Sequence, residues 1–253
     1  MFNSREFPAL DAHAHIAPDV TAAQLDTLHG ALVMAVTRDL EEAAYAALRN
    51  DPSLCWGIGT HPGVPAALEK YEPQRFRELL NDLPLVGEVG LDARGAAPAQ
   101  TTVFASVLQE CAGRPVLISV HSTGMTGEVV EMLTDLPHPG VILHWFNGDK
   151  RQIDTAVGLG AYFSVNAAMS QDVISLMPPE RLLPETDFPS SRRKVRAQIP
   201  GDIAALATSI NARSGETIGA IRSRWFDNLA CLAEDAGVTT RLPLKFQEVL
   251  GRH

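Results

Sequence analysis

The sequence predicts an α/β protein, a single (β/α)8 TIM barrel formed by residues 1–253. Eight short apolar runs of the β type alternate with amphipathic helical stretches, an order that implies right-handed βαβ units and parallel strands. The chain has 253 residues, and about 250 is the usual size of such a barrel. An open doubly wound sheet is the alternative. No Gly-x-Gly-x-x-Gly motif follows the first run, so its dinucleotide-binding form has no support.

The predicted strands are continuous apolar runs such as VLISV and VILHW, which is typical of parallel strands buried on both faces. In chain order they span 8–16, 31–37, 54–61, 85–91, 116–121, 141–145, 161–165 and 181–186. The predicted helices between them span 39–50, 76–83, 101–112, 127–136 and 150–159.

The composition is that of a globular protein, with 45% hydrophobic and 20% charged residues. No apolar run approaches the roughly 20 residues that a membrane-spanning helix needs, and the first residues do not resemble a signal peptide. Three cysteines without CxxC spacing predict reduced, mostly buried thiols and a cytoplasmic location. The net charge of −9 argues against a protein that coats nucleic acid, but it allows an enzyme whose positive charge is bound metal.

Polar residues gather at the carboxyl ends of the predicted strands, where the site of such a barrel lies. The histidines expected there are His13, His15, His61, His121 and His144. The carboxylates expected there are Asp11, Glu88, Asp92, Glu185 and Asp187. The other histidines, at positions 29, 138 and 253, lie in turns or the tail and are expected at the surface.

The first strand gives the strongest local indication of a metal. Asp11, His13 and His15 are two residues apart, so they project from one face. Three polar side chains need partners inside a packed barrel, and imidazole and carboxylate are ligands of divalent metals.

The later strands extend this site to two ions. Glu88 is expected to bridge them, His121 and His144 to hold the second ion, and Asp187 to complete the first and to touch a water molecule. Two neighbouring ions of Mg²⁺, Mn²⁺ or Zn²⁺ that share a carboxylate form a hydrolytic site. Asp187 and Glu88 are the expected catalytic residues.

Six motifs in order resemble the TatD-type metal-dependent deoxyribonucleases, a family of metal-dependent hydrolase barrels. They are DAHAHI, GTHP, VGEVGLD, ISVHS, LHWFNG and ETDFP, spread over residues 11–189, and DNLACL at 227–232 is similar to the family's closing helix. The segments ILHWFNG and AYFSVNAAM are similar to the branch associated with the Qat anti-phage defence systems. The resemblance implies a 3′→5′ exonuclease on single-stranded DNA, with possible defence partner proteins.

By the matching motifs, the resemblance implies the same ligand assignment. It also puts His61 near the substrate phosphate, as a third catalytic residue. Three positions depart from the family pattern: Thr123 stands where an arginine is common, Gly63 where a second histidine often follows, and Phe188 where a small residue is usual. Metal binding is therefore a firmer expectation than the DNA substrate.

Further substrate contacts are expected from the loop after the last strand and from an aromatic pair. Arg192, Arg193 and Lys194 are candidates for a phosphate clamp. Trp145 and Phe146 are candidates for stacking on a base.

Several other residues have expected structural roles. Asp11 is expected either to hold a histidine ring by its second nitrogen or to form a turn. Glu185 is expected to tie the barrel floor to a neighbour. Asn166 is a site candidate without a defined role, and Trp56 and Trp225 are expected in the core.

Two other functions remain open. The first is an amide or ester hydrolase of the same barrel type, many of which bridge their metals with a carboxylated lysine on strand four. Glu88 occupies that place and no lysine lies between Lys70 and Lys150, which favours the nuclease. The second is a catalytically weak subunit that binds nucleic-acid ends within a defence assembly, which the changes at Thr123 and Gly63 keep open.

Overall fold

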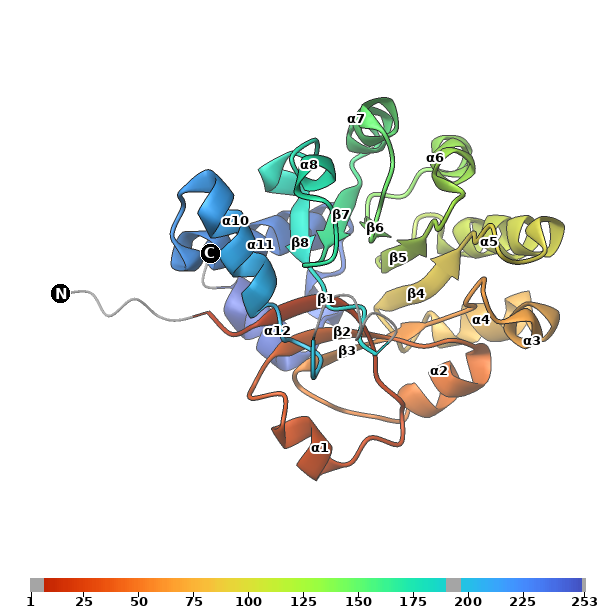
Figure 1. The fold of residues 1–253 in the computed structure, drawn as a ribbon. Helices are drawn as coiled ribbons and strands as arrows, with labels where there is room; N and C mark the ends of the chain where they lie inside the picture. The colour runs from red at the N-terminus through yellow and green to blue at the C-terminus, as the bar shows by residue number, and fades with distance from the viewer. Residues whose placement is uncertain (1–6, 190–196, 252–253) are drawn as a thin grey trace.

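The computed structural model describes residues 7–189 and 197–251 and shows eight parallel strands in sequential order, surrounded by helices (Figure 1). The strands are β1 (Leu10–His15), β2 (Leu32–Val36), β3 (Leu54–Ile58), β4 (Leu85–Gly90), β5 (Leu117–His121), β6 (Val141–His144), β7 (Tyr162–Val165) and β8 (Leu182–Pro184). They form a nearly closed barrel, so the predicted fold class is confirmed.

The helices lie outside this barrel (Figure 1). They are α1 (Ala22–Asp26), α2 (Leu40–Ala46), α3 (Pro65–Glu69), α4 (Pro73–Leu79), α5 (Ala97–Cys111), α6 (Thr126–Asp135), α7 (Lys150–Gly158), α8 (Gln171–Ile174), α10 (Ala204–Ser214), α11 (Ile218–Asp235) and α12 (Leu244–Leu250). Side-chain caps explain where two of them begin. Asp39 accepts hydrogen bonds from two amides at the start of α2, and Asp149 forms a capping box with Gln152 at the start of α7.

Backbone hydrogen bonds join β1 to the segment that follows β8. The amide of Asp187 donates to the carbonyl of His13 at 2.9 Å, and the amide of His15 donates to the carbonyl of Phe188 at 2.7 Å. The buried carboxylate of Asp11 accepts from the amides of Thr186 and Gly201 at 2.9 and 2.8 Å and from the Thr186 hydroxyl. Asp11 therefore fixes backbone beside the site and does not hold a histidine ring.

The predicted strands at 54–61 and 181–186 are longer than β3 and β8, because the chain leaves the ladder just before the polar residues begin. A side chain at Gly59 would lie 1.8 Å from the carbonyl oxygen of Thr37, so only glycine fits this close approach. The site residues His61, Glu185 and Asp187 consequently lie on turns immediately after strands.

The predicted core is confirmed at Trp56 and Trp225, which are both buried. The prediction that His138 lies at the surface is wrong. Its ring is buried, and both of its nitrogens have partners: it accepts from the amide of Gly140 at 3.0 Å and lies 3.1 Å from the carbonyl oxygen of Arg114, 24 positions earlier in the chain. His29 is exposed, as predicted.

Cys55 and Cys111 are buried and Cys231 is exposed. Within the described residues, every helix is too short or too polar to cross a bilayer.

Candidate metal centre

Histidine and carboxylate side chains from six of the eight strands meet at the carboxyl-end mouth of the barrel. They are His13 and His15 from β1, His61 after β3, Glu88 from β4, His121 from β5, His144 from β6 and Asp187 after β8. The structure thus brings together every metal ligand that the sequence predicts.

Glu88 is the centre of this group and is only 1% exposed. Its Oε2 lies 3.0 Å from His15 Nε2, 3.1 Å from His61 Nε2 and 3.7 Å from His13 Nε2. Its Oε1 lies 2.9 Å from His144 Nε2 and contacts His121 Nδ1. One carboxylate therefore faces histidines on two sides, as a bridge between two ions requires.

The donor atoms fit divalent metal. Two sets of three have all their ligand atoms within 4.8 Å of one another: His13, His15 and Glu88, and His61, Glu88 and His121. Asp187 Oδ1 lies 3.8 Å from His15 Nε2 and 3.9 Å from His13 Nε2. His13 Nε2 and Glu88 Oε2 are buried, and neither makes a hydrogen bond with a described residue. Buried polar atoms without a partner are costly, and a bound cation would satisfy both.

Polar neighbours orient the histidine rings. The Nδ1 of His13 lies 2.7 Å from the hydroxyl of Ser119, a fully buried residue of β5. The Nε2 of His121 lies 3.0 Å from Asp92 Oδ2. The Nδ1 of His144 lies 3.5 Å from Glu185 Oε2. The inner nitrogens of His121 and His144 both face Glu88 Oε1. When a metal ion takes these inner nitrogens, the protons are left on the outer nitrogens, which face the carboxylates of Asp92 and Glu185.

His61 has the opposite arrangement. The amide of Gly63 donates to its Nδ1 at 2.9 Å, so the neutral ring carries its proton on Nε2, the atom that faces Glu88. A side chain at Gly63 would approach the Cε1 of His61 to 2.9 Å. His61 is therefore oriented as a hydrogen-bond donor at the mouth rather than as a ligand.

Glu185 lies at the mouth, as its position after the last predicted strand indicates, so only the expectation that it ties the barrel floor to a neighbour is wrong. Its carboxylate accepts from Asn166 Nδ2 at 2.8 Å and from the Ser164 hydroxyl. This assigns a role to Asn166, which helps hold Glu185 against His144. Both residues follow the ends of neighbouring strands β7 and β8.

Arg94 is a site residue that the sequence did not single out. Its guanidinium donates to Asp92, with Nε 2.8 Å from Oδ1, and Asp92 in turn contacts His121. The amide of the preceding Ala93 donates to the carbonyl of Thr123 at 2.9 Å, which places Arg94 next to Thr123. The Arg94 side chain is 73% exposed, so it can also meet a ligand.

The electrostatics of the cluster favour a positive charge at its centre. Burial acts to raise the pKa of Glu88, but the positive charges of His144 and His121 hold that pKa well below its usual range. Burial acts to lower the pKa of His144, yet the carboxylates of Glu88 and Glu185 hold it well above its usual range. Burial lowers the pKa of His13 to about 3 and raises the pKa of Asp187 to about 7. A metal ion would displace the proton from His144.

A cavity of about 320 Å³ opens onto this cluster. It is lined by His61, Glu88, Arg94, His121, Thr123, His144, Trp145, Asn147 and Asp187. Asp187 and Trp145 have positive φ angles of 48° and 41°, a backbone conformation that is uncommon outside glycine and often marks functional sites.

The two aromatic candidates for base stacking differ in burial. Trp145 is half-buried and lines the cavity, so base stacking by it stays a prediction. Phe146 is fully buried, with its ring centroid 5.7 Å from that of Phe163, so the prediction that it stacks on a base is wrong. The predicted clamp at 192–194 lies outside the described residues.

A family sequence profile described as "TatD related DNase" matches residues 10–232. The chain belongs to the TatD-related DNase family. It is therefore a metal-dependent hydrolase that acts on ester bonds, as the motifs predict.

Curated relatives agree with this membership. The "3'-5' ssDNA/RNA exonuclease TatD" of Enterobacter lignolyticus strain SCF1 is 28% identical over 181 residues, which cover 64% of this chain and 68% of that protein. The protein of the same name from Escherichia coli K12 is 24% identical over 216 residues, which cover 75% and 83%. The crystal structure of YjjV, a TatD homologue from E. coli K12, superposes with a TM-score of 0.75 at 23% identity over 88% of this chain and 97% of YjjV, which shows the shared fold.

Proposed function

We propose that this TatD-related protein is a two-metal phosphodiesterase that removes nucleotides from the 3′ ends of single-stranded DNA or RNA. The observation that carries the proposal is the carboxylate of Glu88, which faces histidine nitrogens on both sides at the barrel mouth. The substrate and the polarity come from the names of the relatives. The cytoplasm is the proposed location.

The residues that would hold the first ion are His13, His15 and Asp187, and His121 and His144 would hold the second, with Glu88 between them. Bound divalent ions supply a Lewis acid for the phosphoryl oxygen and make water a better nucleophile. The arrangement of the outer nitrogens is consistent with this assignment, because Asp92 and Glu185 keep the protons of His121 and His144 away from the centre.

The chain's own groups then have separate tasks. Asp187 lies at the edge of the cavity beside His13 and His15, where its carboxylate would accept a proton from the attacking water. His61 donates from Nε2 to a phosphate oxygen. Arg94 contributes a positive charge from the position next to Thr123, where the family commonly has an arginine.

The two competing functions gain less support. An amide hydrolase with a carboxylated lysine would need that lysine where Glu88 stands on β4. A catalytically weak subunit is disfavoured because every predicted ligand lies in the cluster. Membership of the Qat branch and defence partner proteins stay predictions from the sequence.

The experiment compares oligonucleotides labelled at the 3′ or the 5′ end, with protein dialysed against EDTA and then supplied with Mg²⁺, Mn²⁺ or Zn²⁺. We expect no hydrolysis after chelation, recovery on adding metal, and stepwise shortening from the 3′ end of single strands. Full activity after exhaustive chelation would contradict the metal site. Metal-dependent cleavage of an amide or a simple ester with no cleavage of oligonucleotides would contradict the substrate.

A further inference from the structure

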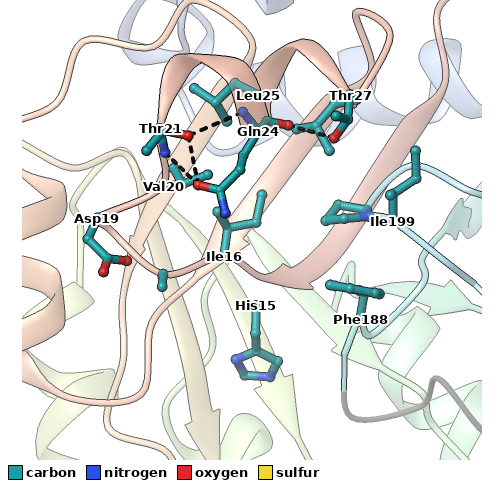
Figure 2. Close-up of a pocket in the computed structure, with 13 residues that line it drawn as sticks. His15, Ile16, Asp19, Val20, Thr21, Gln24, Leu25, Thr27, Phe188 and Ile199 are labelled. Atoms are coloured by element: carbon teal, nitrogen blue, oxygen red, sulfur yellow. Dashed lines mark hydrogen bonds between the residues drawn. The ribbon is translucent and has the colours of Figure 1, made fainter.

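A second cavity adjoins the metal centre on the side of β1. Its volume is about 460 Å³, and it lies between α1, the turn after β1 and the segments around Phe188 and Ile199 (Figure 2). His15 belongs to both places, because its ring lines this cavity while its Nε2 lies 3.0 Å from Glu88. The ring of His15 therefore lies between the metal centre and this second cavity.

The lining is apolar with one aromatic ring and a few polar groups. Ile16, Leu25, Leu28 and Ile199 form its apolar surface, and the half-buried ring of Phe188 forms one edge. An apolar cavity with an aromatic edge suits a heteroaromatic ring better than a sugar or a phosphate, which would lose hydration without gaining hydrogen bonds.

Gln24 adds a directional polar group. Its Oε1 accepts from the amide and the hydroxyl of Thr21, each at 2.9 Å, which fixes the orientation of the side-chain amide. Its Nε2 consequently points away from Thr21 toward the cavity (Figure 2). Gln24 is exposed, so this fixed amide donor lies at the rim of the apolar cavity, where it selects ligands that carry an acceptor at their edge.

We infer that this cavity, named here the β1 cavity, binds the nucleobase of a nucleotide whose phosphate lies at the metal centre. The base stacks against Phe188 and presents an acceptor nitrogen or oxygen to Gln24 Nε2. The inference rests on the proposed function, since it adds a base site to a phosphodiesterase. It goes beyond that function because it makes hydrolysis depend on the base and not only on the backbone.

The experiment uses single-stranded oligonucleotides in which the terminal or the penultimate 3′ nucleotide lacks its base. The protein with Mn²⁺ should lose about 5- to 150-fold in kcat/KM when one of these bases is removed, the usual effect of losing one stacked base. Leu25→Trp, which fills the β1 cavity, should hydrolyse natural and abasic substrates equally slowly. Its Mn²⁺ content should equal that of the wild type, because Leu25 carries no ligand atom, so that the loss can be assigned to the base and not to the metal centre.

Leu48→Trp is the matched control, because Leu48 is 83% exposed and lies outside the β1 cavity, so it should behave like the wild type. Phe188→Leu, which keeps the apolar volume but removes the ring, should reduce the base dependence if Leu25→Trp does not fold. Equal rates on natural and abasic strands in the wild type would overturn the base site, as would base dependence that survives in Leu25→Trp.

Binding of dAMP and of 2-deoxyribose 5-phosphate separates this inference from the proposed function. Tighter binding of dAMP by the wild type, but not by Leu25→Trp, supports the base site even when no oligonucleotide is cleaved. Such binding without any cleavage would overturn the proposed nuclease activity but not the base site. Equal affinity for both compounds would overturn the base site while leaving hydrolysis of phosphodiesters unaffected.

Discussion

The hydroxyl of Ser119 should determine how tightly the metal centre binds its ions, although Ser119 itself touches no metal. It lies 2.7 Å from His13 Nδ1 and is the hydrogen-bond partner of that atom. The substitution Ser119→Ala removes only this hydroxyl from a fully buried position. We expect metal affinity to fall while the fold and the other ligands are retained.

The size of the effect follows from burial and from the two possible tautomers of His13. A buried donor that loses its partner costs about 1–3 kcal/mol, which corresponds to about 5- to 150-fold in a dissociation constant. Without metal, the ring can avoid this cost by moving its proton to Nε2, which faces Glu88 at 3.7 Å. When a metal ion is bound, Nε2 of His13 is the ligand and the proton stays on Nδ1. The cost of the missing hydroxyl therefore falls on the metal-bound state and lowers the metal affinity. Effects of about 10- to 100-fold are usual for such partners.

The assay is a competition of the protein with a chelator of known affinity for Zn²⁺ or Mn²⁺, together with kcat/KM at saturating metal. Ser106→Ala is the matched control. It removes a serine hydroxyl on α5 that lies 3.0 Å from the Tyr71 hydroxyl, outside the metal centre. Thermal unfolding of both metal-free variants measures any general loss of stability. Unchanged metal affinity in Ser119→Ala, with Ser106→Ala as the reference, would refute the reasoning.

Three further outcomes are expected. Asp187→Asn should lose roughly 10²–10⁴-fold in single-turnover rate with at least one metal ion retained, because an amide cannot accept the proton of the water. Glu88→Gln should instead lower metal content and activity together. Normal turnover of fully loaded Asp187→Asn would exclude that role. Alanine at 192–194 should flatten the salt dependence of binding by about 0.7 per lost phosphate contact on single strands; an unchanged slope would leave this loop without a role in binding. Asn228→Ala should lower the melting temperature by about 2–10 °C, because Asn228 Nδ2 donates to the carbonyls of Pro179 and Leu182 at 2.9 and 2.8 Å. Calorimetry measures the melting temperature, and an unchanged value would contradict this structural role of Asn228.

The barrel and the residues at its mouth could be predicted because both depend on short-range pattern and on a topological rule. Apolar runs identify the strands, and parallel strands place all their carboxyl ends at one mouth. His144 illustrates this: its position at the end of an apolar run is informative only because other runs end in the same way. No distance between strands is needed for that inference.

Which partner orients which histidine could not be predicted, because these pairings depend on register between strands. Ser119 meets His13 across the barrel, 106 positions away in the chain, and the ladder between β4 and β5 shifts register near Gly87. Arg94 was missed because its approach to Thr123 depends on one backbone hydrogen bond between loops. His138 was misplaced because its hydrogen bonds with the amide of Gly140 and with the distant carbonyl of Arg114 make its burial inexpensive, and sequence spacing does not show the second of them.

The balance of charge at the centre explains how an acidic protein can attract a phosphodiester, and it leads to a last prediction. The cluster is lined or contacted by four carboxylates, those of Glu88, Asp92, Glu185 and Asp187. Among the residues that line the described cavity, the guanidinium of Arg94 carries the positive charge that partly balances them. With neutral histidines, one divalent ion leaves this group negative, and a second makes it positive. Because unlike charges attract strongly where water is partly excluded, the second ion is required before an anion is held.

Calorimetric titration of inorganic phosphate into protein that carries no metal, one equivalent or two equivalents of Mn²⁺ measures this requirement. We expect the affinity to rise by about 10-fold or more only at the second equivalent. Arg94→Gln serves as the comparison, because it removes one positive charge from the same cavity without removing a ligand, so its affinity should be lower at two equivalents while the dependence on the second ion remains. If phosphate binds with full affinity at one equivalent, the balance of charge does not control substrate binding, and a single ion would be sufficient for the electrostatic attraction.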